Sequence, residues 1–108
     1  MTTTFDKREE GFEKKFAHDE ELRFKATARR NKLVGLWAAG KLGIVGSDAD
    51  AYAKEVVLAD LEEAGDEDVV RKLRKDFDAK SVAVTDQDIR KMMIDTMTQA
   101  IAQIEAGK

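Results

Sequence analysis

Residues 5–39 read FDKREEGFEKKFAHDEELRFKATARRNKLVGLWAA, and the rest of the chain is organised around this stretch. It contains no proline and only two glycines, Gly11 and Gly35. Most of its other residues are good helix formers, so the summed local preference predicts helix. Acid-first pairs at i,i+4, such as Glu21 with Lys25, support a helix by about 0.2–0.5 kcal/mol each. The fold is therefore expected to grow from a long, charged helical region.

The apolar residues of this region form two separate stripes. On a helix of 3.6 residues per turn, the first stripe lies about a quarter turn away from the second. A helix that packs once on one core has no need to change face. We therefore expect the second stripe to pack on the chain's own core and the first to contact a partner, although a solvated helix face would also explain the charges around it. The first stripe is Phe5, Phe12 and Phe16, and the second is Leu22, Ala26, Leu33 and Trp37.

Length and composition limit the classes of protein to which the chain can belong. Its 108 residues suit one domain. A net charge of −3 and a pI near 5.2 argue against a general nucleic-acid binder, whose domain is usually basic. No apolar run reaches the ~20 residues of a membrane span, and the N-terminus lacks a signal-peptide core. With no cysteine, disulfides and thiolate chemistry are excluded. These features predict a cytosolic protein. The absence of proline and the near absence of alternating β-branched residues predict an all-α fold.

Turn and capping residues divide the chain after residue 19 into four helices. The first is expected from Asp19 to about Leu42, where glycines follow, and the second from Ser47 to Gly65. Asp66 is expected to cap the third helix. Short connections of this kind predict a small antiparallel four-helix bundle. The glycines are Gly40, Gly43 and Gly46, and the face of the second helix is Ala53, Val57, Leu61 and Ala64, flanked by Tyr52, Val56 and Ala59.

The second half of the chain gives equally clear signals. Residues 81–84 form a linker that inserts Val82 and Val84 between helices, and Thr85 caps the last helix with Asp88 three residues later. The buried stripes of these two helices are Val69, Val70, Leu73 and Phe77, followed by Ile89, Met93, Met97, Ala100 and Ile104.

No constellation of residues indicates catalysis. His18 is the one histidine and stands among charges. A triad would need a Ser or Cys nucleophile arranged with it. The stretch from Gly35 to Leu42 fits GxxxxGK but lacks the Ser or Thr of a phosphate loop, and a helix end explains it better. A weak site for ADP or ATP at Lys41 and Ser47 stays open. We expect no metal site, no tightly bound cofactor and no enzyme activity.

A basic patch surrounds Phe24, which lies opposite the second stripe. Phe24 is either a second contact point or an exposed aromatic side chain. The patch is suited to an acidic partner or is a solvated face. We name as second-contact candidates Arg23, Phe24, Arg29 and Arg30, with Lys25 beside them.

The same run of residues 5–39, followed by a glycine-rich turn and an acid-capped helix, resembles the zeta subunit of alphaproteobacterial F-type ATP synthases. The resemblance covers essentially the whole chain. It implies a four-helix bundle over residues 19–108 and a mobile N-terminal segment over residues 1–18. It also implies an inhibitor of ATP hydrolysis in the bacterial cytoplasm, held at the inner membrane only through the ATP synthase.

The resemblance further implies how such an inhibitor acts. Its N-terminal segment becomes helical at an interface between alpha and beta subunits, beside the rotating gamma subunit, and blocks rotation in the hydrolytic direction. The positions that match are Phe5, Asp6, Arg8, Glu9, Phe12, Glu13 and Phe16. The alternative is a small helical adaptor that binds a nucleotide and senses the energy state of the cell.

Overall fold

The computed structural model describes residues 20–62 and 66–107, which form four α-helices. Among these residues there is no strand, so the expected all-α class and four-helix bundle are confirmed. The helices are α2 (Glu20–Leu42), α3 (Ser47–Glu62), α4 (Glu67–Ala79) and α5 (Asp86–Glu105).

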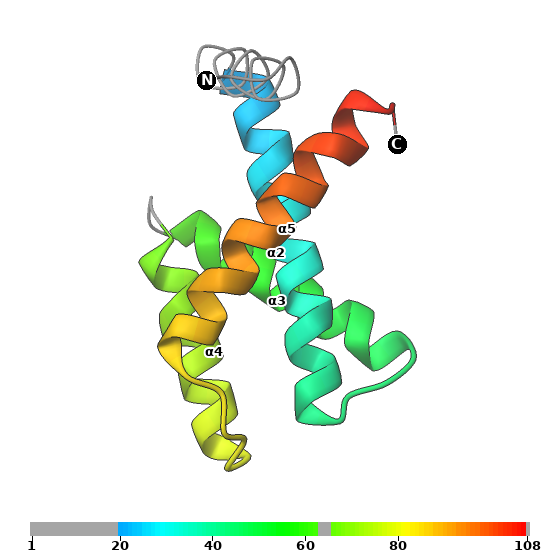
Figure 1. Ribbon diagram of the computed structural model, residues 1–108. Coiled ribbons are helices and arrows are strands. Elements are labelled where there is room, and N and C mark those ends of the chain that lie inside the picture. Colours follow the sequence, from blue (N-terminus) through cyan, green and yellow to red (C-terminus); the bar gives the residue numbers. More distant parts are fainter. Residues whose placement is uncertain (1–19, 63–65, 108) are drawn as a thin grey trace.

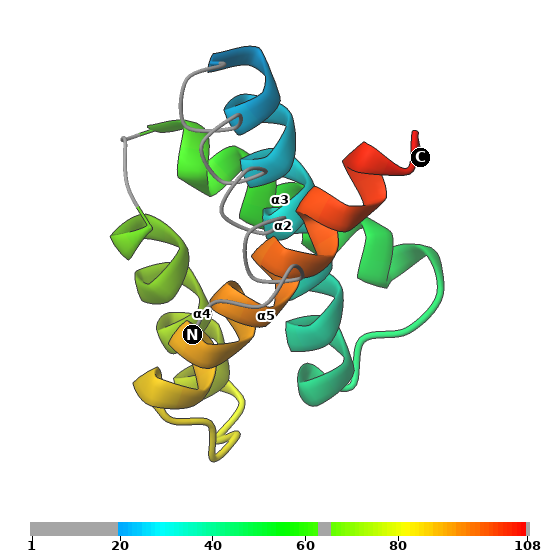
Figure 2. The same cartoon turned by 45° about the horizontal axis from the view of Figure 1, so that its top comes forward.

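Helix α2 is the central element of the bundle. It packs against each of the other three helices, while α4 also contacts α3 and α5. Figure 1 shows α5 crossing α2, with α4 beside them and the end of α5 at the same side of the molecule as the start of α2. The turned view in Figure 2 shows the same crossing. Because α2 packs against three neighbours, its side chains must fit against all of them.

Two helices end in the same hydrogen-bonded motif. Beyond α2, Gly43 has φ +76°, its N–H donates to Gly40 O, and the N–H of Ile44 donates to Ala39 O at 2.9 Å. This is the Schellman arrangement, which satisfies carbonyls at a helix end. Gly40 therefore lies inside the helix, and Gly43 makes the stop. Beyond α4, Ser81 takes the equivalent place with φ +57°, although a side chain is unfavourable in that conformation.

The starts of α4 and α5 differ. Thr85 caps α5 as predicted, because its hydroxyl accepts from the Asp88 N–H at 3.1 Å and the Asp88 carboxylate accepts from the Thr85 N–H. Asp66 stands at the cap position of α4, but its side chain makes no cap hydrogen bond. The predicted cap position of Asp66 is therefore right, but its carboxylate does not cap the helix because it accepts from Arg30 at 2.9 Å.

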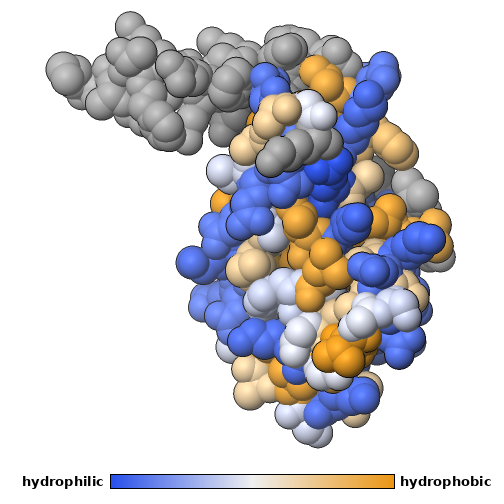
Figure 3. All heavy atoms as spheres, turned by 90° about the vertical axis from the view of Figure 1, so that its right-hand side faces the viewer, coloured by the Kyte–Doolittle hydropathy of each residue, from blue (hydrophilic) through white to orange (hydrophobic). Residues whose placement is uncertain are grey.

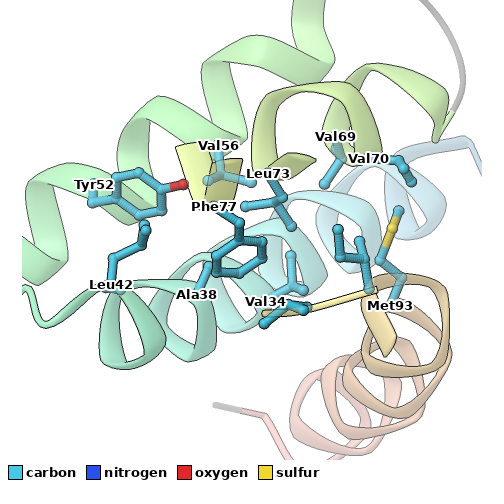
Figure 4. Packing of buried hydrophobic residues seen from close by; sticks show 13 residues of the cluster. Val34, Ala38, Leu42, Tyr52, Val56, Val69, Val70, Leu73, Phe77 and Met93 are labelled. Atoms are coloured by element: carbon cyan, nitrogen blue, oxygen red, sulfur yellow. The ribbon is translucent and has the colours of Figure 1, made fainter. Parts of the chain in front are cut away.

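The core centres on Phe77 of α4, which is fully buried, and the ring of Trp37 meets it edge-on at 5.8 Å between centroids. Figure 4 shows Phe77 pointing toward Val34 and Ala38 of α2. Val84 of the 81–84 linker is buried and Val82 packs against the core, as predicted. The other main core members are Leu42, Tyr52, Val56, Val69, Val70, Leu73, Ile89 and Met93.

The predicted core faces are right in outline and displaced on two helices. On α2, Ala26 is buried and Trp37 reaches Phe77, but Leu22 and Leu33 are half-buried. The fully buried line runs instead through Val34 and Ala38, toward α3 and α4. On α3 the buried face is Tyr52, Ala53 and Val56, with Val57 half-buried. Gly65 lies outside the described residues.

Candidate partner-binding surface

The residues predicted to inhibit lie outside the part of the chain that the structure describes. The division between residues 1–18 and 19–108 therefore stays a prediction. These residues are Phe5, Asp6, Arg8, Glu9, Phe12, Glu13 and Phe16, and His18 lies outside as well. The described surface that adjoins them is the first half of α2, which begins at Glu20.

The second-contact candidates on α2 do not form a single patch. Successive helix residues are about 100° apart, so Arg23 and Phe24 point to different sides. Both are exposed, Phe24 to 62%. Arg29 is half-buried against α5, where its Nη1 donates to Gln103 Oε1 at 2.8 Å. Of the four, only Arg23 and Phe24 present their side chains largely to solvent.

Arg30 is an internal residue, which corrects the expectation that it contacts a partner. Only 3% of it is exposed, and its Nη1 donates to Asp66 Oδ1 at 2.9 Å. Its Nε and Nη2 donate to Asn31 Oδ1, and Asn31 Nδ2 donates to Asp60 Oδ2 at 2.9 Å. The hydrogen-bonded series Asp66–Arg30–Asn31–Asp60 joins the start of α4 to α2 and α3. A buried charge is unfavourable unless it is paired and hydrogen-bonded. Because the partners of Arg30 connect to α3 and α4, Arg30 helps to hold these helices to α2.

A stripe of α2 that the sequence analysis did not single out remains at the surface. Glu21, Lys25, Ala28 and Lys32 recur at i, i+4, i+7 and i+11, a spacing that places them on one side of a helix. All are exposed except Ala28, which is half-buried. Lys25 pairs with Glu21 at 3.2 Å. We call Glu21, Phe24, Lys25, Ala28 and Lys32 the outer face of α2. In the sequence, the seven-residue interval from Lys25 to Lys32 could have indicated that these two lysines share one side of the helix.

Polar and apolar side chains alternate over the described surface shown in Figure 3. Figure 3 shows hydrophobic residues reaching the surface as separate areas between hydrophilic ones on the face it displays. Among residues 20–62 and 66–107, three large apolar side chains besides Phe24 are exposed, and they come from different elements. They are Val45 in the turn before α3, Leu58 on α3 and Ile94 on α5.

Lys41 and Ser47 lie on either side of the turn between α2 and α3. Both are exposed, Lys41 in the last turn of α2 and Ser47 at the first residue of α3. Asp48 and Asp50 occupy the first turn of α3, and their charges oppose a phosphate there. The hydrogen bonds from Thr85, and less strongly the positive charge of Lys41, lower the pKa of Asp88. Nucleotide binding at Lys41 and Ser47 stays a prediction.

Neither a metal site nor a membrane span is found in residues 20–62 and 66–107. No three or more His, Cys, Asp or Glu side chains of this part are grouped to hold an ion. None of its helices is both long enough and apolar enough to cross a bilayer.

The chain is similar to known proteins over most of its length. The model of the family described as ATPase inhibitor subunit zeta matches residues 1–103. A protein whose structure was solved by NMR in solution is 48% identical and superimposes with a TM-score of 0.72. That match covers 81% of this chain and 99% of the other. The comparison with curated proteins gave no match.

Proposed function

The chain belongs to the ATPase inhibitor subunit zeta family, and we propose that it inhibits ATP hydrolysis by the catalytic head of the F-type ATP synthase through residues 1–18. One observation carries this proposal. The family match runs from residue 1 to residue 103, so it includes the N-terminal segment together with α2, α3, α4 and all but the last two residues of α5. The segment that we propose as the effector and the bundle that carries it therefore both lie within the region that the family model matches.

The apolar residues of the chain support this division of labour. Phe77 and Trp37 belong to the core of the bundle, whereas Phe5, Phe12 and Phe16 precede its first described helix. Three aromatic residues at helical spacing are suited to a groove on a partner. Since aromatic side chains bury a large area, they dominate the energetics of many interfaces.

The proposed contact is an interface between alpha and beta subunits, beside the gamma subunit. There the Phe residues act as anchors, and their burial offsets the entropy lost when the segment becomes ordered. The charges between the anchors pair with a polar rim, which sets orientation and association rate more than affinity. The proposed rim residues are Asp6, Arg8, Glu9 and Glu13.

The bundle serves as a rigid mount in this proposal. Glu20 begins a 23-residue helix that packs against three neighbours, and most of its buried residues lie in its second half. The Arg30–Asn31 pair fixes this helix to α3 and to the start of α4. The segment is therefore attached to a body that does not need to reorganise when the segment binds.

The experiment that tests the proposal is ATP hydrolysis by a purified catalytic head. Full-length protein and a version lacking residues 1–18 are added in increasing amounts. We expect inhibition only by the full-length chain, while both versions unfold at the same temperature. Equal inhibition by both versions would place the effector in the bundle, and no inhibition by either would overturn the proposal.

The nucleotide-binding adaptor is a second proposal and is tested separately. The free protein is titrated with ATP and ADP while its backbone amide NMR signals are followed. Saturable shifts confined to residues 41–47 would support it. Since Asp48 and Asp50 stand beside this turn, we expect any such binding to be weak.

A further inference from the structure

The charges of the chain are unevenly distributed over its helices. Although the whole chain carries −3, α2 is strongly basic and α3 strongly acidic. The basic residues of α2 are Arg23, Lys25, Arg29, Arg30, Lys32 and Lys41, against Glu20 and Glu21. The acidic residues of α3 are Asp48, Asp50, Glu55, Asp60 and Glu62, against Lys54. A positive stripe on an otherwise acidic protein orients that protein in the field of a charged partner.

Packing within the bundle accounts for only some of these positive charges. Arg30 is buried against Asp66 and Asn31, and Arg29 donates to Gln103 of α5. Lys25 and Lys32, by contrast, stand exposed on the outer face of α2. The pair between Lys25 and Glu21 is solvated on both sides, so exchanging it for another carboxylate costs little.

Phe24 adds an aromatic group to this positive surface. It is 62% exposed and lies between Glu21 and Ala28 on the outer face, three and four residues away. Ala28 is small, so the surface beside the ring is shallow and a partner can approach the helix closely. An aromatic side chain surrounded by charges is the usual form of an interface anchor with its rim.

The position of this surface indicates which partner it meets. Phe24 lies four residues after Glu20, where α2 continues the chain from the proposed inhibitory segment. A partner that binds residues 1–18 would therefore be close, along the chain, to the outer face of α2. The other exposed apolar side chains do not lie on the helix that follows residues 1–18. They are Val45, Leu58 and Ile94.

We propose that the outer face of α2 docks on an acidic surface of the catalytic head, next to the entry point of residues 1–18, with Phe24 in an apolar socket. This inference rests on the proposed function and adds a second contact to it. Lys25 and Lys32 accelerate the encounter and orient the bundle, while Phe24 slows dissociation.

Charge reversal tests the proposal. The variant carrying Lys25→Glu and Lys32→Glu is compared with one carrying Lys75→Glu and Lys91→Glu, which makes the same change of net charge at exposed positions of α4 and α5. Binding of each full-length chain to the immobilised head is measured at low and high salt. At low salt we expect the α2 variant to associate roughly 10-fold more slowly, and the control within about twofold of the unchanged protein. The difference should disappear at high salt.

Phe24→Ala gives an independent readout. It should raise the dissociation rate by about five- to tenfold without changing thermal unfolding, since the ring is exposed. Equal behaviour of the α2 and control variants, with an unchanged dissociation rate for Phe24→Ala, would overturn the docking inference even if the protein inhibits. Failure of the unchanged chain to bind the head would overturn the proposed function as well. Lysine-dependent binding to anionic lipid vesicles, without any effect on the head, would assign this surface to a membrane instead.

Discussion

Gly35 of α2 lies directly against Ala53 of α3. A Cβ atom at Gly35 would stand 2.8 Å from Ala53 Cα, and also 3.2 Å from Val56 Cγ2. The first of these distances is shorter than a van der Waals contact between carbons. The two helices therefore approach each other more closely than any residue except glycine would allow at this position.

Alanine usually stabilises a helix relative to glycine, but at position 35 we expect it to destabilise the protein. We expect Gly35→Ala to lower the free energy of unfolding by about 1–2 kcal/mol, because overpacking outweighs the gain in helix propensity. Gly40 is the matched control: it lies in the same helix, with nothing within 4 Å of a Cβ. Gly40→Ala should raise stability by about 0.5–1 kcal/mol. Urea unfolding followed by Trp37 fluorescence measures both, and similar gains would contradict the close approach.

The stop of α4 offers a stabilising substitution. Ser81 has φ +57°, a conformation that glycine adopts without steric cost. We expect Ser81→Gly to raise the free energy of unfolding by about 0.5–1 kcal/mol. Ala83→Gly, two residues along the same linker, should lower it slightly by increasing the entropy of the unfolded chain. Thermal unfolding distinguishes the two, and a loss of stability in Ser81→Gly would count against this account.

The buried polar series should be sensitive to truncation of its central member. Asn31→Ala removes the acceptor of Arg30 Nε and Nη2 and the donor to Asp60 Oδ2, while Asp66 still holds Arg30 Nη1. Asp60 Oδ1 is already buried without a hydrogen-bond partner among the described residues. We expect a loss of about 2–3 kcal/mol. Lys32→Ala, at the next and exposed position, should change stability by less than about 0.5 kcal/mol. Equal effects in chemical unfolding would show that the series contributes little.

Tyr52 should make the protein unstable at alkaline pH. Its hydroxyl donates to Asp76 Oδ2 at 2.7 Å, and Lys72 Nζ shares that acceptor at 3.0 Å. Burial, together with the hydrogen bond and charge of Asp76, raises the pKa of Tyr52 above its ordinary value. The folded state thus keeps a proton that the unfolded state loses, so stability is complete below about pH 10 and falls as pH rises above it.

Spectroscopy can follow this titration directly, because Tyr52 is the one tyrosine of the chain. We expect its phenolate absorbance to appear together with unfolding, in one cooperative step. Tyr52→Phe should lose about 1 kcal/mol near neutral pH and depend less steeply on pH above about 10. Gradual ionisation of Tyr52 in the folded protein would contradict the raised pKa.

Substitution of the proposed anchors tests whether inhibition and stability are separate. Phe12→Ala combined with Phe16→Ala should abolish inhibition of ATP hydrolysis, because the segment then lacks the apolar contacts that offset its ordering. Thermal unfolding should stay unchanged, since neither residue belongs to the described core. A parallel loss of stability and inhibition would rule out the separation between effector and mount.

Local signals predicted the helices of this fold well, and tertiary contacts decided where the prediction was wrong. Thr85 and Asp88 cap α5 as expected, and all four apolar positions of α4 are buried, because those patterns depend on neighbours in sequence. Asp66 looked like a cap as well. Its carboxylate contacts Arg30, 36 residues away, and no local pattern contains that information.

The same reason limits what could be predicted of the partner surface. Arg23, Lys25, Arg29 and Arg30 look alike in sequence, and only the packing of α4 and α5 separates the buried and hydrogen-bonded members from the exposed ones. Phe24 was singled out as an aromatic opposite the core stripe. Lys32 was not, because its importance depends on which side of α2 the neighbouring helices leave open.

The continuity of α2 has a mechanical consequence for anything attached before Glu20. Because the helix is held at Arg30 and Asn31, its first turns act as a lever whose direction and rotational phase are set by the bundle. One alanine inserted between Leu22 and Arg23 would advance the attached segment by about 1.5 Å and turn it by about 100°. Seven inserted residues would restore the phase to within about 20° while lengthening the lever by about 10 Å. The proposed inhibitory segment would thus be coupled to the bundle in angle as well as in distance.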